Sequence, residues 1–106
     1  MKIAIDYDDT FTADRAMWRE IVAVMLSHHH DVTFVTARVQ MTEGWSNSNS
    51  DIEHDAAHLG IPIKYTNNKQ KSECFTADIW CDDSPEMIPS IDLIKSIALL
   101  DSAVST

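Results

Sequence analysis

The sequence predicts an α/β fold, in which short strands alternate with helices around a mostly parallel central sheet. Apolar runs of strand length occur at residues 3–5, 32–36 and 77–81. Between these runs, apolar residues recur at helical spacing. An alternation of β and α segments is typical of a parallel sheet whose crossovers are helices and are right-handed.

The first helix is expected at about residues 14–28. Asp14 suits the positive end of the helix dipole, and Met17, Ile21 and Val24 recur on one stripe. The predicted buried face is wide and includes the residues that flank this stripe, namely Trp18, Val22 and Met25.

A second helix is expected to start at Ser50. Ser50 and Glu53 form a capping-box pattern, and Gly60 closes the segment. One apolar stripe lies between them: Ile52, Ala56 and Leu59. A short strand at 61–65 follows, with Pro62 near its start, and a last strand or helix is expected at about 97–100.

Two of the predicted strands end in carboxylates. Asp6 and Asp8 follow the first strand, and Asp82 and Asp83 follow the run at 77–81. In an open α/β sheet the carboxyl ends of the strands form the site, so these acids are expected to share one cation. Oxygen ligands of this kind suit Mg²⁺.

A third strand tip adds a hydroxyl and a cation. Thr36 ends the run at 32–36, and Arg38 follows two residues later. Acids, hydroxyls and a guanidinium gathered at strand tips suit a phosphate with a metal ion better than an acyl substrate.

These motifs resemble those of the haloacid dehalogenase (HAD) superfamily, whose phosphatases carry four dispersed motifs on a Rossmann-like core. The D-x-D-x-T motif is matched by Asp6, Asp8 and Thr10, the second motif by Thr36, the lysine by Lys71 with Lys69 as a rival, and the final acidic pair by Asp82 and Asp83. One departure is Asp9, where the family often has glycine.

The resemblance implies a single domain over residues 1–106, built as a Rossmann-like three-layer sandwich. It also implies that no cap domain is present, because the intervals 10–14 and 65–71 are too short to hold one. The implied activity is Mg²⁺-dependent hydrolysis of a phosphomonoester through a phosphoaspartate. The expected substrate is a small phosphorylated metabolite or a nucleotide.

Carried over by motif, Asp6 is the expected nucleophile and Asp8 the general acid and base. Lys71 is expected to neutralise charge on the nucleophile and the phosphate. On the substrate side, Thr36 would bind a phosphoryl oxygen and Thr10 would hold the loop that carries Asp8. Arg38 and Arg15 are the remaining cations best placed for substrate. The expected metal ligands are Asp6, the backbone carbonyl of Asp8, and Asp82, with Asp83 in support.

Two other classes fit part of the pattern. A signalling receiver domain has a similar size, but it needs a phosphorylatable aspartate at the tip of the third strand, where this chain has Tyr65 and Thr66. A catalytically idle HAD-like binding module is the second alternative. The filled motif positions argue against it.

Composition limits the partners. The 106 residues carry a net charge of −9 with only eight Lys and Arg, so tight nucleic-acid binding is not expected. No apolar run reaches the ~20 residues of a membrane span, and a cytoplasmic location is expected. The two cysteines show no metal-ligand spacing. Oligomeric state is left open.

Two further segments carry alternative interpretations. The polar stretch 42–50 is either a lid, with Trp45 stacking on substrate, or a simple surface loop. His54 and His58 have the i, i+4 spacing of a zinc motif. His54, however, is expected to point away from the buried stripe, which favours a solvated helix face.

Overall fold

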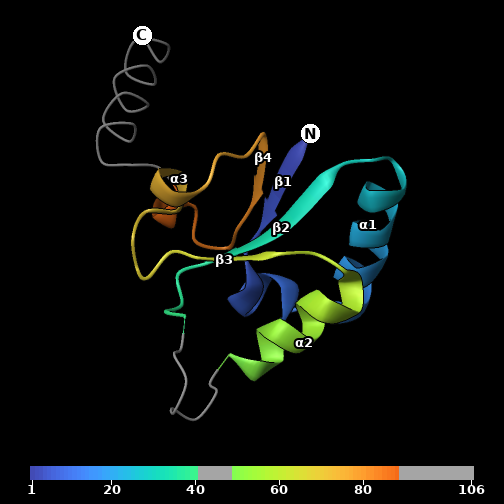
Figure 1. Ribbon diagram of the computed structural model, residues 1–106, viewed down its shortest axis with the longest axis horizontal. Helices are drawn as coiled ribbons and strands as arrows, with labels where there is room; N and C mark the ends of the chain where they lie inside the picture. Colours follow the sequence, from blue (N-terminus) through green and yellow to red (C-terminus); the bar gives the residue numbers. More distant parts are fainter. Residues whose placement is uncertain (41–48, 89–106) are drawn as a thin grey trace, which may run out of the picture.

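A parallel sheet forms the centre of the molecule (Figure 1). The structure, a computed structural model, describes residues 1–40 and 49–88. Within them the sheet has four strands in the order β3-β2-β1-β4, and every neighbouring pair is parallel. The strands are β1 (Lys2–Ile5), β2 (Asp31–Thr36), β3 (Ile63–Tyr65) and β4 (Ile79–Cys81). The predicted α/β class with a parallel sheet is confirmed.

The helical connections first move the chain toward one edge of the sheet and then return it to the other edge. α1 (Arg15–Ser27) and α2 (Ser50–Leu59) carry the chain from β1 to β2 to β3, whereas α3 (Lys71–Cys74) lies in the return to β4. Right-handed crossovers therefore place α1 and α2 on one face of the sheet and α3 on the other, as Figure 1 shows. The reversal creates a topological switch point between β1 and β4. In such sheets, ligands bind at this point.

The strand order also separates two fold types. It matches the first four strands of the classic doubly wound order, in which β4 lies beside β1. In the flavodoxin-like order of receiver domains, the third strand lies beside the first. Here β3 lies beyond β2, so the described sheet does not have the receiver arrangement.

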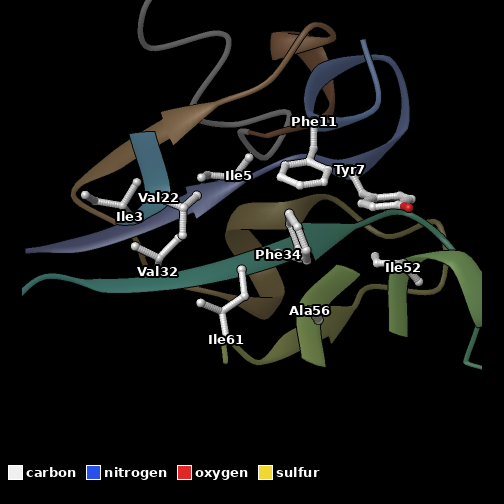
Figure 2. Packing of buried hydrophobic residues seen from close by; sticks show 10 residues of the cluster. All are labelled: Ile3, Ile5, Tyr7, Phe11, Val22, Val32, Phe34, Ile52, Ala56 and Ile61. Carbon is white, nitrogen blue, oxygen red and sulfur yellow. The ribbon is translucent and has the colours of Figure 1, made fainter. Parts of the chain in front are cut away.

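The core is built around three aromatic rings. Phe11 lies 4.9 Å from Phe34 and 5.7 Å from Tyr7, while Tyr7 lies 5.3 Å from Phe34, all measured between ring centroids. Both contacts to Phe34 are edge-to-face, the arrangement that aromatic quadrupoles favour. Figure 2 shows the three rings side by side, with Ile52 and Ala56 of α2 next to them.

The buried face of α1 is narrower than the predicted one. Val22 is fully buried, whereas Met17 is 42% exposed and Val24 is 58% exposed. Trp18 and Met25 pack against the core, as predicted. The prediction that Met17 and Val24 are buried was wrong, because the sequence carries two apolar stripes one residue apart. Packing against the sheet selects the stripe through Val22.

The N-terminus of α2 is also built differently. Asn49 is the N-cap, Ser50 is already helical, and neither forms the predicted capping box with Glu53. The Asn49 side chain instead donates to the carbonyl of Val39 at 2.9 Å. The C-terminus is as predicted: Gly60 ends the helix in the left-handed conformation, with φ of 71°.

The last two strands are shorter than predicted. β3 begins at Ile63 and not at Ile61, and β4 begins at Ile79, which is 40% exposed. At the start of β4 the Asp78 carboxylate accepts a hydrogen bond from the backbone N–H of Lys2 at 2.8 Å. The backbone N–H of Asp78 also donates to the Lys2 carbonyl at 2.8 Å, so Asp78 pairs with β1 one residue before β4 begins.

Some expectations fall outside the described residues: those for 41–48, including Trp45, and those for 97–100. His54 and His58 are both exposed, as the solvated-face interpretation requires. Cys74 and Cys81 are free thiols. Among the described residues, no helix combines the length and the apolar character needed to cross a bilayer.

Candidate functional site

The candidate site lies where β1 and β4 end side by side. Ile5 pairs with Cys81, and the N–H of Asp6 donates to the Cys81 carbonyl at 2.9 Å. Asp6 and Asp82 therefore leave adjacent parallel strands at the same level. This is the switch point of the sheet, where strand tips hold side chains on a rigid support.

A tight turn with two i→i+5 hydrogen bonds, η1 (Tyr7–Phe11), follows β1 directly, and its backbone is not helical at Asp8 and Asp9. Its bonds run from the N–H of Phe11 to the Asp6 carbonyl at 3.3 Å and from the N–H of Thr12 to the Tyr7 carbonyl at 3.1 Å. Asp9 has a φ of 61°, a conformation that Asp tolerates better than most residues.

This turn brings Thr10 back to the acids. Its Oγ1 lies 3.1 Å from Asp6 Oδ2 and 3.1 Å from Asp83 Oδ1, and it accepts a bond from the N–H of Asp83 at 3.1 Å. Because a hydroxyl has one proton, Thr10 can donate to one of the two carboxylates at a time. Thr10 thus ties the turn after β1 to the loop after β4.

Three carboxylates meet at this point. Asp6, Asp82 and Asp83 each offer an oxygen, and these oxygens lie within 4.8 Å of one another. It is the one group of this kind in the described residues 1–40 and 49–88. Such an all-oxygen donor set fits a hard divalent cation such as Mg²⁺.

Lys71 supplies the cation in contact with these acids. Its Nζ lies 2.8 Å from Asp6 Oδ1 and 2.5 Å from Asp82 Oδ2, and its side chain is only 3% exposed. Lys69, the rival in the sequence, is exposed. The structure therefore places Lys71, the first residue of α3, at the site.

The electrostatics of the cluster reflect its burial. Desolvation raises the pKa of Asp6 from 3.8 to about 6, against the opposing effect of Lys71. The neighbouring Asp83 also raises this pKa, while its own pKa is lowered by its hydrogen bond with Asp6. One ammonium does not fully compensate three adjacent carboxylates, which is the situation that a bound divalent cation would relieve.

A pocket of about 180 Å³ opens above the cluster. Thr36 contributes to its wall and is nearly fully buried, with its Oγ1 accepting from the N–H of Arg38 at 3.2 Å. The sequence-predicted residues that line the pocket are Asp6, Asp8, Thr36, Lys71, Asp82 and Asp83. Thr10 and Arg38 do not line it.

Arg38 is engaged by two carboxylates. Its guanidinium donates to both oxygens of Asp8, at 2.7 and 2.9 Å, and to both oxygens of Asp51, at 2.7 and 3.0 Å. It also lies 5.2 Å from the centroid of the Tyr7 ring. The hydrogen bonds that Arg38 donates to Asp8 and Asp51 raise the pKa of Arg38, and Arg38 in turn lowers the pKa of Asp51.

A second polar network, which the sequence did not lead us to expect, joins the turn after β1 to α1 and α2. Asp55 of α2 is buried and accepts bonds from Tyr7 Oη at 2.5 Å, Arg15 Nε at 3.2 Å and Arg19 Nη2 at 3.2 Å. Arg15, expected to face substrate, is held here instead. The signal in the sequence was Asp55 itself, which falls three residues after Ile52 on the buried stripe.

Fold and site together define a small α/β domain, compatible with a Rossmann-like fold, that carries an acidic pocket at its switch point. Comparisons with models of known families, with curated proteins and with solved structures found no match.

Proposed function

We propose that this protein is a HAD-type, Mg²⁺-dependent phosphomonoester hydrolase that acts through a phosphoaspartate on Asp6. The observation that carries the proposal is the meeting of Asp6, Asp82 and Asp83 within 4.8 Å, with Lys71 bonded to two of them. The four residues come from two strand ends and a helix start that are far apart in sequence. Their convergence at a switch point is typical of a binding site.

The carboxylates of Asp6, Asp82 and Asp83, with the backbone carbonyl of Asp8, would hold Mg²⁺. When bound, the cation would offset the charge of the acids and withdraw electron density from the phosphoryl oxygens. Within the same proposal the fold is a three-layer HAD-like sandwich without a cap domain. The short intervals between β1 and α1 and between β3 and α3 support it.

Hydrolysis would proceed in two displacements. The Asp6 carboxylate attacks phosphorus, the bond from phosphorus to the ester oxygen breaks, and the leaving oxygen takes a proton from Asp8. Asp8 then takes a proton from water, whose oxygen attacks phosphorus and releases inorganic phosphate and Asp6. Lys71 and the Thr36 hydroxyl would stabilise charge on the transferring group.

The substrate proposed is a small phosphorylated metabolite, with a nucleotide preferred. A second hollow, of about 470 Å³, shares Asp9, Asp82 and Asp83 with the acidic pocket and is lined by Trp18 and Trp80. Flat aromatic side chains suit a nucleobase. On this view, Trp80→Ala should raise KM for nucleoside monophosphates and leave KM for glycerol phosphate unchanged; equal effects on both would remove the preference.

The decisive experiment measures release of phosphate from an aryl phosphate in Mg²⁺. Asp6→Asn should remove turnover, because the amide is neither a nucleophile nor an anionic ligand. Asp31→Asn is a matched control: it removes the same charge from an exposed residue at the start of β2, at the opposite end of the strands from the acids. Asp6→Asn activity above a few per cent of wild type would refute a nucleophilic Asp6. Absence of Mg²⁺-dependent release from the wild-type protein would favour the idle binding module.

A further inference from the structure

The guanidinium of Arg38 is saturated by its contacts. Nε and Nη2 donate to Asp8, while Nη1 and Nη2 donate to Asp51 and Nη1 also reaches Asn49 Oδ1 at 3.5 Å. An arginine has five N–H donors, and these contacts use donors on all three nitrogens. A phosphoryl group can reach this guanidinium only by displacing one of the carboxylates.

The same pair also restrains Asp8. Both of its oxygens accept from Arg38, Oδ1 at 2.7 Å and Oδ2 at 2.9 Å. A carboxylic acid that transfers a proton to or from substrate must present a free oxygen. Asp8 therefore has to leave Arg38, at least on one side, before it can act as the acid and base of the proposed reaction.

Asp51 is the more firmly held of the two partners. Its Oδ1 also accepts from the N–H of Ile52 at 2.8 Å, in the first turn of α2, where a negative charge is favoured. Asp8 sits on the turn after β1, and the two side chains are similarly exposed, at 52% for Asp8 and 46% for Asp51. Asp8 and Ala37 line the acidic pocket, whereas Arg38 does not. Asp8 thus stands between the pocket and Arg38.

We propose that a phosphoryl group entering the acidic pocket replaces Asp8 on Arg38, so that substrate binding releases Asp8 for proton transfer, and that Asp51 is the positioning residue that keeps Arg38 aimed at the pocket. The exchange swaps one anion for another and changes no covalent bond. A phosphoryl group offers more acceptor oxygens to a guanidinium fork than a carboxylate does. The release of Asp8 for chemistry rests on the proposed hydrolase function; the exchange itself does not.

The test measures binding of inorganic phosphate, in Mg²⁺, to variants of the full chain. Asp8→Asn should tighten phosphate binding about three- to tenfold, because it removes the competitor for Arg38. Asp9→Asn removes the same charge from the neighbouring residue, which also lines the pocket but is not one of the two carboxylates that hold Arg38, and should tighten binding less. Equal affinities for the two variants would overturn the exchange.

Two further variants test the roles of Arg38 and Asp51. The gain from Asp8→Asn should vanish when Arg38→Gln is added, and persistence of the gain would overturn the proposal. Asp51→Asn should weaken phosphate binding severalfold, and Asp51→Glu should restore part of it. In wild type, the NMR signal of the Arg38 Nε–H should shift on phosphate addition; an unmoved signal at saturation would also overturn it.

The two proposals fail separately. If the wild-type protein hydrolyses no phosphomonoester but Asp8→Asn still tightens phosphate binding through Arg38, the exchange stands and the hydrolase is refuted. If turnover is present but phosphate affinity does not depend on Arg38, the hydrolase stands and the exchange is refuted.

Discussion

At the scale of single residues, the molecule is organised by a few buried charges. Asp6 and Asp55 are both carboxylates at buried positions, and their surroundings move their pKa values in opposite directions. Asp6 faces other acids with one ammonium, whereas Asp55 faces two guanidiniums and a phenol. The first arrangement suits a ligand that is yet to bind, and the second suits a permanent structural tie.

The raised pKa of Asp6 predicts that the metal-free protein loses stability as the pH rises. This pKa is raised from 3.8 to about 6, so the folded state binds this proton more tightly than the unfolded chain does. The contribution of Asp6 to stability is therefore full below about pH 4 and is lost as the pH rises through 6. Asp6→Asn should remove this loss and raise the free energy of unfolding at pH 7.5 by at most about 3 kcal/mol. Urea unfolding of both proteins at pH 4.5 and 7.5, with a chelator present, measures this difference in the free energy of unfolding. Parallel pH profiles for variant and wild type would contradict it.

The lowered pKa of Asp55 predicts the opposite pH dependence of stability. Burial raises the pKa of Asp55, but bonds from Tyr7, Arg15 and Arg19 outweigh burial and lower it. Its stabilisation is present above the unfolded pKa of about 4 and is lost as the pH falls. Asp55→Asn should cost about 3 kcal/mol at pH 7, because it leaves the network partly unpaired.

The control for Asp55 is Asp31→Asn, at the exposed first residue of β2, which should change stability by less than about 0.5 kcal/mol. Equilibrium urea unfolding of both variants at pH 7 provides the comparison. Equal stabilities would mean that the Asp55 network is not a structural tie.

At the scale of elements, the structure selects between equivalent sequence patterns. The apolar residues of α1 allow two stripes, and contact with the sheet places Val22 inside and Val24 outside. Likewise, α2 starts at the predicted residue, but the Asn49 side chain bonds to Val39 rather than capping the helix, and Asp51 is used by Arg38. Helical periodicity predicts that a helix forms; its rotation about its axis depends on its partner.

The rotation of α1 can be tested with a matched pair of substitutions. Val22→Ala should destabilise the protein by about 2 kcal/mol, since it removes buried methyl groups and leaves a cavity. Val24→Ala, two residues away and 58% exposed, should be neutral or slightly stabilising because alanine favours helix. Thermal unfolding compares them. A larger loss for Val24→Ala would restore the stripe first predicted.

At the scale of the whole molecule, the sheet order creates the site. Because β4 returns to the far side of β1, the two acid-tipped strands become neighbours, and α3 places Lys71 between their acids. A ligand that binds only this folded arrangement must stabilise it, by an amount that grows with the logarithm of the ligand concentration above its dissociation constant.

Mg²⁺ should therefore raise the melting temperature of the wild-type protein. At about 100 times its dissociation constant, the cation would add about 2.7 kcal/mol to the free energy of unfolding. Asp82→Asn should abolish most of the shift, because it removes one of the three clustered carboxylates. Differential scanning calorimetry with Mg²⁺, and with Na⁺ at equal ionic strength, measures it. The same shift in Na⁺, or in Asp82→Asn, would argue against a metal site.

The sequence by itself determined the features that depend on neighbours along the chain. Strand-length apolar runs and helical periodicity gave the α/β class, and the acids after two strands located the candidate site at Asp6 and Asp82. These signals are local, because a strand tip and the residue that follows it are adjacent in sequence.

Only the tertiary structure decided which distant side chains meet. It placed Lys71 rather than Lys69 on the acids, paired Arg38 with Asp8 and Asp51, and drew Arg15 to the buried Asp55. Each of these contacts joins residues from different elements. Their geometry follows from strand order and helix rotation, which are set by packing of the whole core and leave no trace in the spacing of any one segment.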